Sequence, residues 1–212
     1  MKYLLYIFYF FRSVFLRGFF NTFKLLRAEA RFEKLFHIKT AAIKKSDSLD
    51  YFHYQGASYL VLLRIFKEVS PQTKDFDFVD IGSGKGRAVF VAENCGYNTL
   101  YGIELDCTLL KDAVENLKHY AFKRKESDIL FVHQNAIEYS YTNRPSVYFL
   151  FNPFNEQVME KVLQKISSCT DKESWFIYMN PQYTKPFTDK KMELIKEFKT
   201  GRYLEAVVFK MN

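Results

Sequence analysis

From residue 57 onward, the apolar positions alternate between short runs typical of buried strands and the three- and four-residue spacing typical of helices. The runs predict strands at residues 77–81, 99–105, 128–133, 146–152 and 174–180, and the spacing predicts helices at residues 57–69, 87–94, 108–122 and 156–167. Ser70-Pro71 is expected to end the first helix, and Thr108 to cap the third.

The last two apolar segments, residues 191–199 and 202–210, are joined by Thr200-Gly201 and predict an antiparallel hairpin. Strands that alternate with helices favour a doubly wound α/β fold with a mostly parallel sheet. We therefore expect a seven-stranded, mostly parallel sheet that closes with an antiparallel hairpin. This domain is expected to span residues 51–212, after a polar connector at residues 38–56.

The first 36 residues have a different pattern, which predicts one long helix with few breakers. Residues 3–11 are apolar on all sides. From Arg12 on, polar residues recur in steps of three or four and form a basic stripe opposite Phe and Leu; they are Ser13, Arg17, Asn21, Lys24, Arg27 and Arg31. Residues 1–50 are therefore expected to form a basic helical extension, here called the N-terminal extension.

Arg12 and Arg17 interrupt the apolar run, which argues against a membrane-spanning helix. No small-residue cleavage site follows it, which argues against a signal peptide. Two interpretations remain open: residues 1–35 lie on an anionic membrane surface, or they pack on the α/β domain or on a second subunit. The basic stripe favours the membrane surface, so removal of residues 1–35 is expected to release the protein from membranes and to leave cofactor binding intact.

Charge is concentrated in the N-terminal extension, where ten Lys/Arg and four Asp/Glu give a net charge of +6. The remaining residues have a net charge of only +1, so we expect no nucleic-acid partner. Three cysteines are widely spaced, and His53, His119 and His133 have no metal-ligand spacing. We expect no metal site and a cytoplasmic protein, peripheral on the inner face of the membrane if the extension binds lipid.

Three glycines, Gly82, Gly84 and Gly86, directly follow the apolar run at residues 77–81. A glycine-rich turn between a strand and a helix lets the backbone approach a ligand closely. The spacing does not match a P-loop, and G-x-G-x-G differs from the dinucleotide fingerprint G-x-G-x-x-G. Lys85 and Arg87, within and after the turn, are expected to be solvated.

Together with Asp80, these glycines form D-x-G-x-G-x-G, which resembles motif I of the class I S-adenosylmethionine (SAM) methyltransferases. The resemblance covers roughly residues 50–212 and implies a Rossmann-like fold with SAM as cofactor. It implies that the methionine end of SAM is held by Asp80 and by the backbone of Gly82, Ser83 and Gly84. Gly86 would let the helix pack closely, and Glu104 would bind the ribose hydroxyls. Asn135 stands where these enzymes often carry an acid near the adenine amino group.

The sequence Asn152-Pro153-Phe154 resembles a shortened form of the [DN]-P-P-[FY] motif of amino-group methyltransferases. These three residues are therefore the candidate catalytic residues, with the Asn152 oxygen accepting from the target N–H and the Phe154 ring packing on the substrate. Asn180-Pro181 ends the next strand at the same edge, as a second candidate for the acceptor pocket or as a plain turn.

Bacterial methyltransferases with DxGSGKGR and NPF motifs, and Rossmann-type lysine methyltransferases, also resemble the chain, and their tyrosine segment makes Tyr54 a candidate cofactor contact. The resemblance implies methyl transfer to an amino group, of a protein lysine or a small amine. A nucleic-acid methyltransferase and a non-catalytic SAM-fold module anchored at a membrane surface remain the alternatives.

Overall fold

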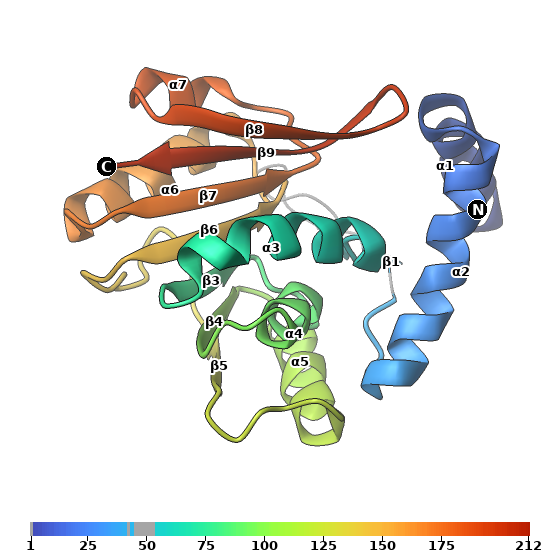
Figure 1. The fold of residues 1–212 in the computed structure, drawn as a ribbon, viewed down its shortest axis with the longest axis horizontal. Helices are drawn as coiled ribbons and strands as arrows, with labels where there is room; N and C mark the ends of the chain where they lie inside the picture. Colours follow the sequence, from blue (N-terminus) through green and yellow to red (C-terminus); the bar gives the residue numbers. More distant parts are fainter. Residues whose placement is uncertain (1, 42, 45–53) are drawn as a thin grey trace.

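The computed structural model describes residues 2–41, 43–44 and 54–212, and only the backbone of residues 2–6, 8–9, 43–44 and 54. A seven-stranded sheet forms its centre, in the order β5-β4-β3-β6-β7-β9-β8 (Figure 1). The strands are β3 (Asp77–Ile81), β4 (Thr99–Glu104), β5 (Asp128–His133), β6 (Ser146–Phe151), β7 (Ser174–Met179), β8 (Glu193–Thr200) and β9 (Tyr203–Met211). Only β9 runs antiparallel to its neighbours, so the predicted α/β sheet with its closing hairpin is confirmed.

Helices cover both faces of this sheet. On one face lie α3 (Tyr59–Thr73), α4 (Arg87–Asn94) and α5 (Cys107–His119); on the other lie α6 (Glu156–Cys169) and the short α7 (Lys185–Asp189) (Figure 1). Each face has its own apolar cluster, because the central strands are buried on both sides. The strand order changes direction between β3 and β6, which places the topological switch point at the ends of these two strands.

The structure differs from the sequence-based predictions at the start of α5, at the end of α3 and in the short α7. Asp106, not Thr108, caps α5, because its carboxylate accepts from the N–H groups of Thr108 and Leu109. The first helix of the domain continues through Pro71 to Thr73, whose hydroxyl donates to the carbonyl of Val69 at 3.1 Å. Helix α7 was not predicted, because five residues are too few to establish a helical period.

The N-terminal extension forms two helices, α1 (Lys2–Arg17) and α2 (Phe19–Phe36), so the prediction of one long helix is wrong. Gly18 separates them with a φ of 87°, a conformation that glycine adopts at little cost. The hydroxyls of Ser13 and Thr22 lie 2.9 Å apart and join the two helices across the bend. A short antiparallel pair, β1 (Ile43–Lys44) and β2 (Tyr54–Gln55), follows; most of the predicted connector lies outside the described residues.

Helices α1 and α2 lie at the end of the sheet toward which the parallel strands run (Figure 1). The Arg17 guanidinium binds both carboxylate oxygens of Glu205, at 2.6 and 2.8 Å, and lies 3.9 Å from the centre of the Tyr203 ring. The predicted stripe is therefore divided: Ser13 and Arg17 face the α/β domain, while Lys24, Arg27 and Arg31 are exposed. Within the described residues, no helix is both long enough and apolar enough to cross a bilayer.

Candidate active site

The glycine-rich loop lies at the switch point, between the end of β3 and the start of α4. Gly82, Gly84 and Gly86 have φ values of 85°, 54° and 84°, which side chains other than glycine rarely tolerate. A Cβ on Gly86 would lie 2.5 Å from the Phe131 ring and 2.9 Å from the Phe90 ring. Gly86 thus allows the start of α4 to pack closely, and any larger residue there would displace both rings.

The loop turns its N–H groups toward β4. Gly82 and Ser83 donate to the carbonyl of Ile103 at 2.9 and 3.0 Å, and Gly84 donates to the Glu104 carboxylate at 2.7 Å. The hydroxyl of Ser83 is buried and has no hydrogen-bond partner in the described part of the chain. A ligand at this loop therefore meets acceptor groups and the Ser83 hydroxyl rather than these three backbone donors.

Glu104 closes β4 and binds the loop directly. Its second carboxylate oxygen accepts from the N–H of Asp106 at 2.7 Å, so each oxygen holds one backbone donor. A carboxylate has about four acceptor positions, and the N–H of Leu105 is a third backbone donor that acts on this group, so capacity remains for a further donor such as a ligand hydroxyl. Burial raises the pKa of Glu104, and the backbone donors at Asp106 and Gly84 oppose this rise.

Asp80 lies near the end of β3, the strand that leads into the glycine-rich loop, and is 3% exposed. In the described part of the chain, no group donates a hydrogen bond to its carboxylate. Burial and the neighbouring charge of Glu104 raise the pKa of Asp80 well above its ordinary value. Two buried acids beside the glycine-rich loop favour a cationic ligand, and the sulfonium and ammonium groups of SAM are cations of this kind.

We expect the affinity for SAM to increase with pH. Because the pKa of Asp80 is raised, part of the ligand-free protein is protonated there at mildly acidic pH, whereas a cationic ligand favours the ionised carboxylate. Calorimetry across a pH series, in buffers of different ionisation enthalpy, should detect release of a proton on binding after the free ligand's own titration is subtracted. An affinity that is constant or falls as pH rises contradicts this assignment.

The Asn152-Pro153-Phe154 turn follows β6 and lies against the glycine-rich loop. The Cβ of Pro153 lies 2.9 Å from the position that a Cβ on Gly82 would take. Asn152 is buried, with a φ of 41°, and its side-chain oxygen accepts from the Tyr178 hydroxyl at 2.8 Å. The turn therefore brings the candidate catalytic amide to the cofactor loop, with one lone pair of its oxygen already bound.

Comparison with protein-family models and with curated protein sequences gave no match. Solved structures do match. They include magnesium protoporphyrin IX methyltransferase from Synechocystis PCC 6803 with bound SAM, at 12% identity over 72% of this chain and 77% of that chain, with a TM-score of 0.55. The ribosomal protein L11 methylase of Lactobacillus delbrueckii subsp. bulgaricus matches at 13% identity over 72% and 77%, with a TM-score of 0.52. TrmK of M. capricolum, solved with S-adenosyl-homocysteine, matches at 12% identity over 71% and 67%, with a TM-score of 0.53.

The chain has the fold of the SAM-dependent methyltransferases. The remaining candidate residues occupy different places in this methyltransferase fold. Asn135 follows β5 at the same edge as Glu104, and its side-chain oxygen accepts from the N–H of Ile137 at 3.0 Å. Phe154 is buried in the apolar cluster beneath the sheet, which favours a packing role over contact with the substrate. The backbone of Tyr54 lies in β2, but its side chain lies outside the described residues.

Asn180, the second Asn-Pro candidate, ends β7 next to Asn152. Its φ is 47°, and its side-chain oxygen accepts from the Tyr203 hydroxyl at 2.6 Å. The Tyr178 hydroxyl that binds Asn152 also accepts from the N–H of Gln182 at 3.2 Å. The Tyr178 hydroxyl thus connects the two Asn-Pro turns, while the side-chain oxygen of Asn180 is bound within the protein by Tyr203 of β9.

The expectation of a solvated Arg87 is wrong, because this residue is only 4% exposed. Its guanidinium pairs with Glu29 at 2.5 Å and with Glu33 at 3.2 Å, both from α2, and lies 4.2 Å from the centre of the Tyr59 ring. Arg87 is the first residue of α4, directly after the glycine-rich loop. The N-terminal extension therefore supplies the counter-charges for a buried cation beside the candidate cofactor site.

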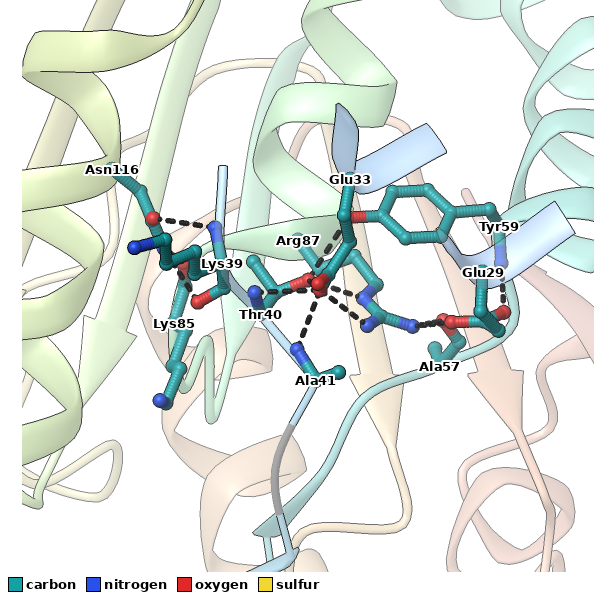
Figure 2. Close-up of polar contacts among 10 residues, drawn as sticks. All are labelled: Glu29, Glu33, Lys39, Thr40, Ala41, Ala57, Tyr59, Lys85, Arg87 and Asn116. Carbon is teal, nitrogen blue, oxygen red and sulfur yellow. Dashed lines mark hydrogen bonds and ion pairs between the residues drawn. The ribbon is translucent and has the colours of Figure 1, made fainter. Parts of the chain in front are cut away.

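Thr40 and Glu33 complete this buried cluster. The Thr40 hydroxyl accepts from Nε of Arg87 at 2.7 Å and lies 2.9 Å from the Tyr59 hydroxyl. One carboxylate oxygen of Glu33 accepts from the Thr40 N–H at 2.7 Å and from the Ala41 N–H at 2.5 Å (Figure 2). The segment after α2 is thus fixed to α2, to α3 and to α4 by the same few polar groups.

Asn116 of α5 ties the same segment to the glycine-rich loop. Its side-chain oxygen accepts from the Lys39 N–H at 2.8 Å, and its amide nitrogen donates to the Lys85 carbonyl at 3.1 Å (Figure 2). Lys85 is half-buried and pairs with Asp112 at 3.0 Å, so the expectation that it is solvated is only partly correct. A sequence signal existed for the contact of α2 with Arg87. Glu29 and Glu33 are the only acidic residues before Asp47, and they are four positions apart on one helical face.

Proposed function

We propose that the protein is a SAM-dependent methyltransferase. The observation that carries this proposal is the pair of buried carboxylates, Asp80 and Glu104, at the switch point of a methyltransferase fold. Asp80 has no donor in the described part of the chain, and Glu104 has spare acceptor positions. A ligand that combines a cation with a ribose diol satisfies both carboxylates at once.

Bound SAM supplies an electrophilic methyl group on a sulfonium. The protein's own residues then have to bind, orient and exclude water. Asp80 and the loop around Ser83 face the charged methionine end, and Glu104 accepts from the ribose hydroxyls. Asn135, which follows β5 at the same edge, is our candidate to accept a hydrogen bond from the adenine amine. Displacement at a methyl group depends mainly on alignment, so such positioning supplies most of the rate enhancement.

We further propose that the acceptor is an amino group, of a protein lysine or a small amine. The support is Asn152, whose buried side-chain oxygen lies in a turn packed against the glycine-rich loop. With the Tyr178 hydroxyl on one lone pair, the second lone pair of this oxygen remains to accept from an amine N–H. An amine held by an acceptor directs its own lone pair at the methyl group. Proximity to a sulfonium and exclusion of water both favour its neutral form.

The test is methyl transfer from radiolabelled SAM to components of a cell lysate, with the product identified by mass. We expect label on an amine. Asn152→Ala should reduce turnover about 100-fold, the typical effect of one lost positioning or electrostatic contact, while the affinity for SAM stays unchanged. Asn143→Ala, at a site remote from the switch point, is the control. Label on nucleic acid would contradict the amine proposal, and SAM binding without any transfer would contradict catalysis.

A further inference from the structure

Apolar side chains cover the outward surface of α1 and α2 around the bend at Gly18. Phe20 is 87% exposed and Phe15 is 75% exposed. The same surface, here called the aromatic face, includes Ile7, Phe11, Phe19, Phe23 and Leu26, all of which are exposed. Apolar residues grouped in this way on one surface typically mark a site of interaction.

Basic side chains surround the aromatic face. Those exposed on α1 and α2 are Arg12, Lys24, Arg27, Arg31 and Lys34. The two acidic residues of α2, Glu29 and Glu33, turn inward and bind Arg87. In the described part of these helices, the outward surface therefore combines apolar and positively charged groups and carries no carboxylate.

We propose that the aromatic face and its basic residues bind the surface of an anionic lipid bilayer. In this arrangement the Phe rings enter the boundary between headgroups and acyl chains, while the Lys and Arg side chains reach the lipid phosphates. Neither helix is apolar and long enough to span a bilayer, so the helices lie in the interface. The inward polar contacts of Arg17 and of Glu29 fix the extension to the α/β domain and keep the apolar side outward.

Charge complementarity favours a bilayer over a second copy of the chain. A two-fold contact would place the same surface on both sides and bring the two sets of Lys and Arg together, with no acid on either side to pair with them. Nucleic acid is disfavoured because the aliphatic Ile7 and Leu26 share the surface with the rings, and aliphatic groups offer no stacking contact to bases.

Both attachments of the extension lie at the carboxyl edge of the sheet (Figure 1). Arg17 binds near the start of β9, and Glu29 binds Arg87 directly after the glycine-rich loop. Membrane binding by the aromatic face therefore holds this edge close to the lipid surface. It follows that the methyl acceptor is presented at the membrane surface. This last step alone rests on the proposed methyl transfer.

Co-sedimentation of the full-length protein with phosphatidylcholine vesicles, with and without phosphatidylglycerol, tests the proposal. We expect binding to the anionic vesicles that weakens at high salt. Phe15→Ser with Phe20→Ser should weaken binding about 100-fold, because two Phe side chains that the bilayer would bury are lost. Lys24→Gln with Arg27→Gln and Arg31→Gln should weaken it by a similar factor. Leu130→Ser with Leu194→Ser, two exposed apolar residues of the edge strands β5 and β8, should change nothing.

Each other outcome overturns the proposal. These outcomes are no binding to anionic vesicles, equal binding to neutral vesicles, or concentration-dependent dimerisation that the Phe variants abolish. Binding to a single-stranded oligonucleotide that the same variants abolish would identify nucleic acid as the partner. Binding of SAM, measured in parallel on every variant, keeps this result separate from failure of the methyltransferase assignment.

Discussion

Asp80→Asn is expected to abolish SAM binding and, at the same time, to stabilise the ligand-free protein. Loss of a buried charge partner should weaken SAM binding by about 100-fold or more. The folded-state pKa of Asp80 is raised, so its ionised form opposes folding, and this penalty develops as the pH rises above the unfolded-state value of about 3.9. Removing it should increase the free energy of unfolding at neutral pH, and each kcal/mol gained raises Tm by about 2–4 °C for a domain of this size.

Calorimetry with SAM and thermal unfolding of the ligand-free protein measure the two effects. Asp128→Asn, at an exposed carboxylate that begins β5, is the matched control and should change neither quantity. Glu104→Gln should also lose SAM binding, because an amide cannot accept on both sides as the carboxylate does. An Asp80 variant that is less stable than the wild type, or that binds SAM normally, would show that this carboxylate stabilises the fold and does not bind the cofactor.

Arg87→Met is expected to lower the free energy of unfolding by about 3–5 kcal/mol, since it leaves the carboxylates of Glu29 and Glu33 without their buried cation. Urea unfolding followed by circular dichroism measures this loss. Adding Glu29→Gln and Glu33→Gln to the same chain should recover part of it, because the uncompensated charges are then removed. Lys118→Met, which breaks an exposed pair with Glu115, should have little effect. A stable Arg87→Met protein would contradict the importance of this cluster.

The Arg87 cluster also changes what is expected from truncation. From the sequence, removal of residues 1–35 appeared neutral for cofactor binding. The structure instead shows that this truncation removes Glu29 and Glu33, the two carboxylates that pair with Arg87 directly after the glycine-rich loop. We therefore expect the truncated chain to be unstable and to bind SAM poorly, so exposed point substitutions are the better probe of the membrane surface.

The sequence predicted the α/β fold well because its signals are local. Buried strands appear as apolar runs, and the turn at Gly82, Gly84 and Gly86 needs glycine for reasons that hold in any context. The position of Glu104 beside this turn follows from strand order alone, since parallel strands end at the same edge of a sheet. The carboxyl ends of β3, β4 and β6 therefore met as expected, although cofactor and acceptor roles stay predictions.

Contacts between distant segments could not be predicted in the same way. A charged residue after a glycine-rich loop is usually solvated. The sequence shows that Glu29 and Glu33 share one helical face, but not that they meet Arg87, which lies 58 positions after Glu29. The stripe on the first helices was read correctly as polar, but its division was not foreseen: Lys24, Arg27 and Arg31 are exposed, whereas Arg17 binds the α/β domain. An amphipathic helix shows only that its faces differ, not what each face contacts. Gly18 was a second local signal that was underused, since a glycine inside a helical pattern often marks an end.

The bond between Arg17 and Glu205 joins positions 188 apart and so bears on how the chain folds. The first helix leaves the ribosome long before β9, the last strand, exists to receive it. Helix α2 can attach as soon as α4 has formed, whereas the contact of α1 with Glu205 can form only after β9 has been made. Contacts of such long separation form slowly. Helix α1 is therefore synthesised long before the strand that fixes it, and during that interval its Arg17 has no domain carboxylate to bind.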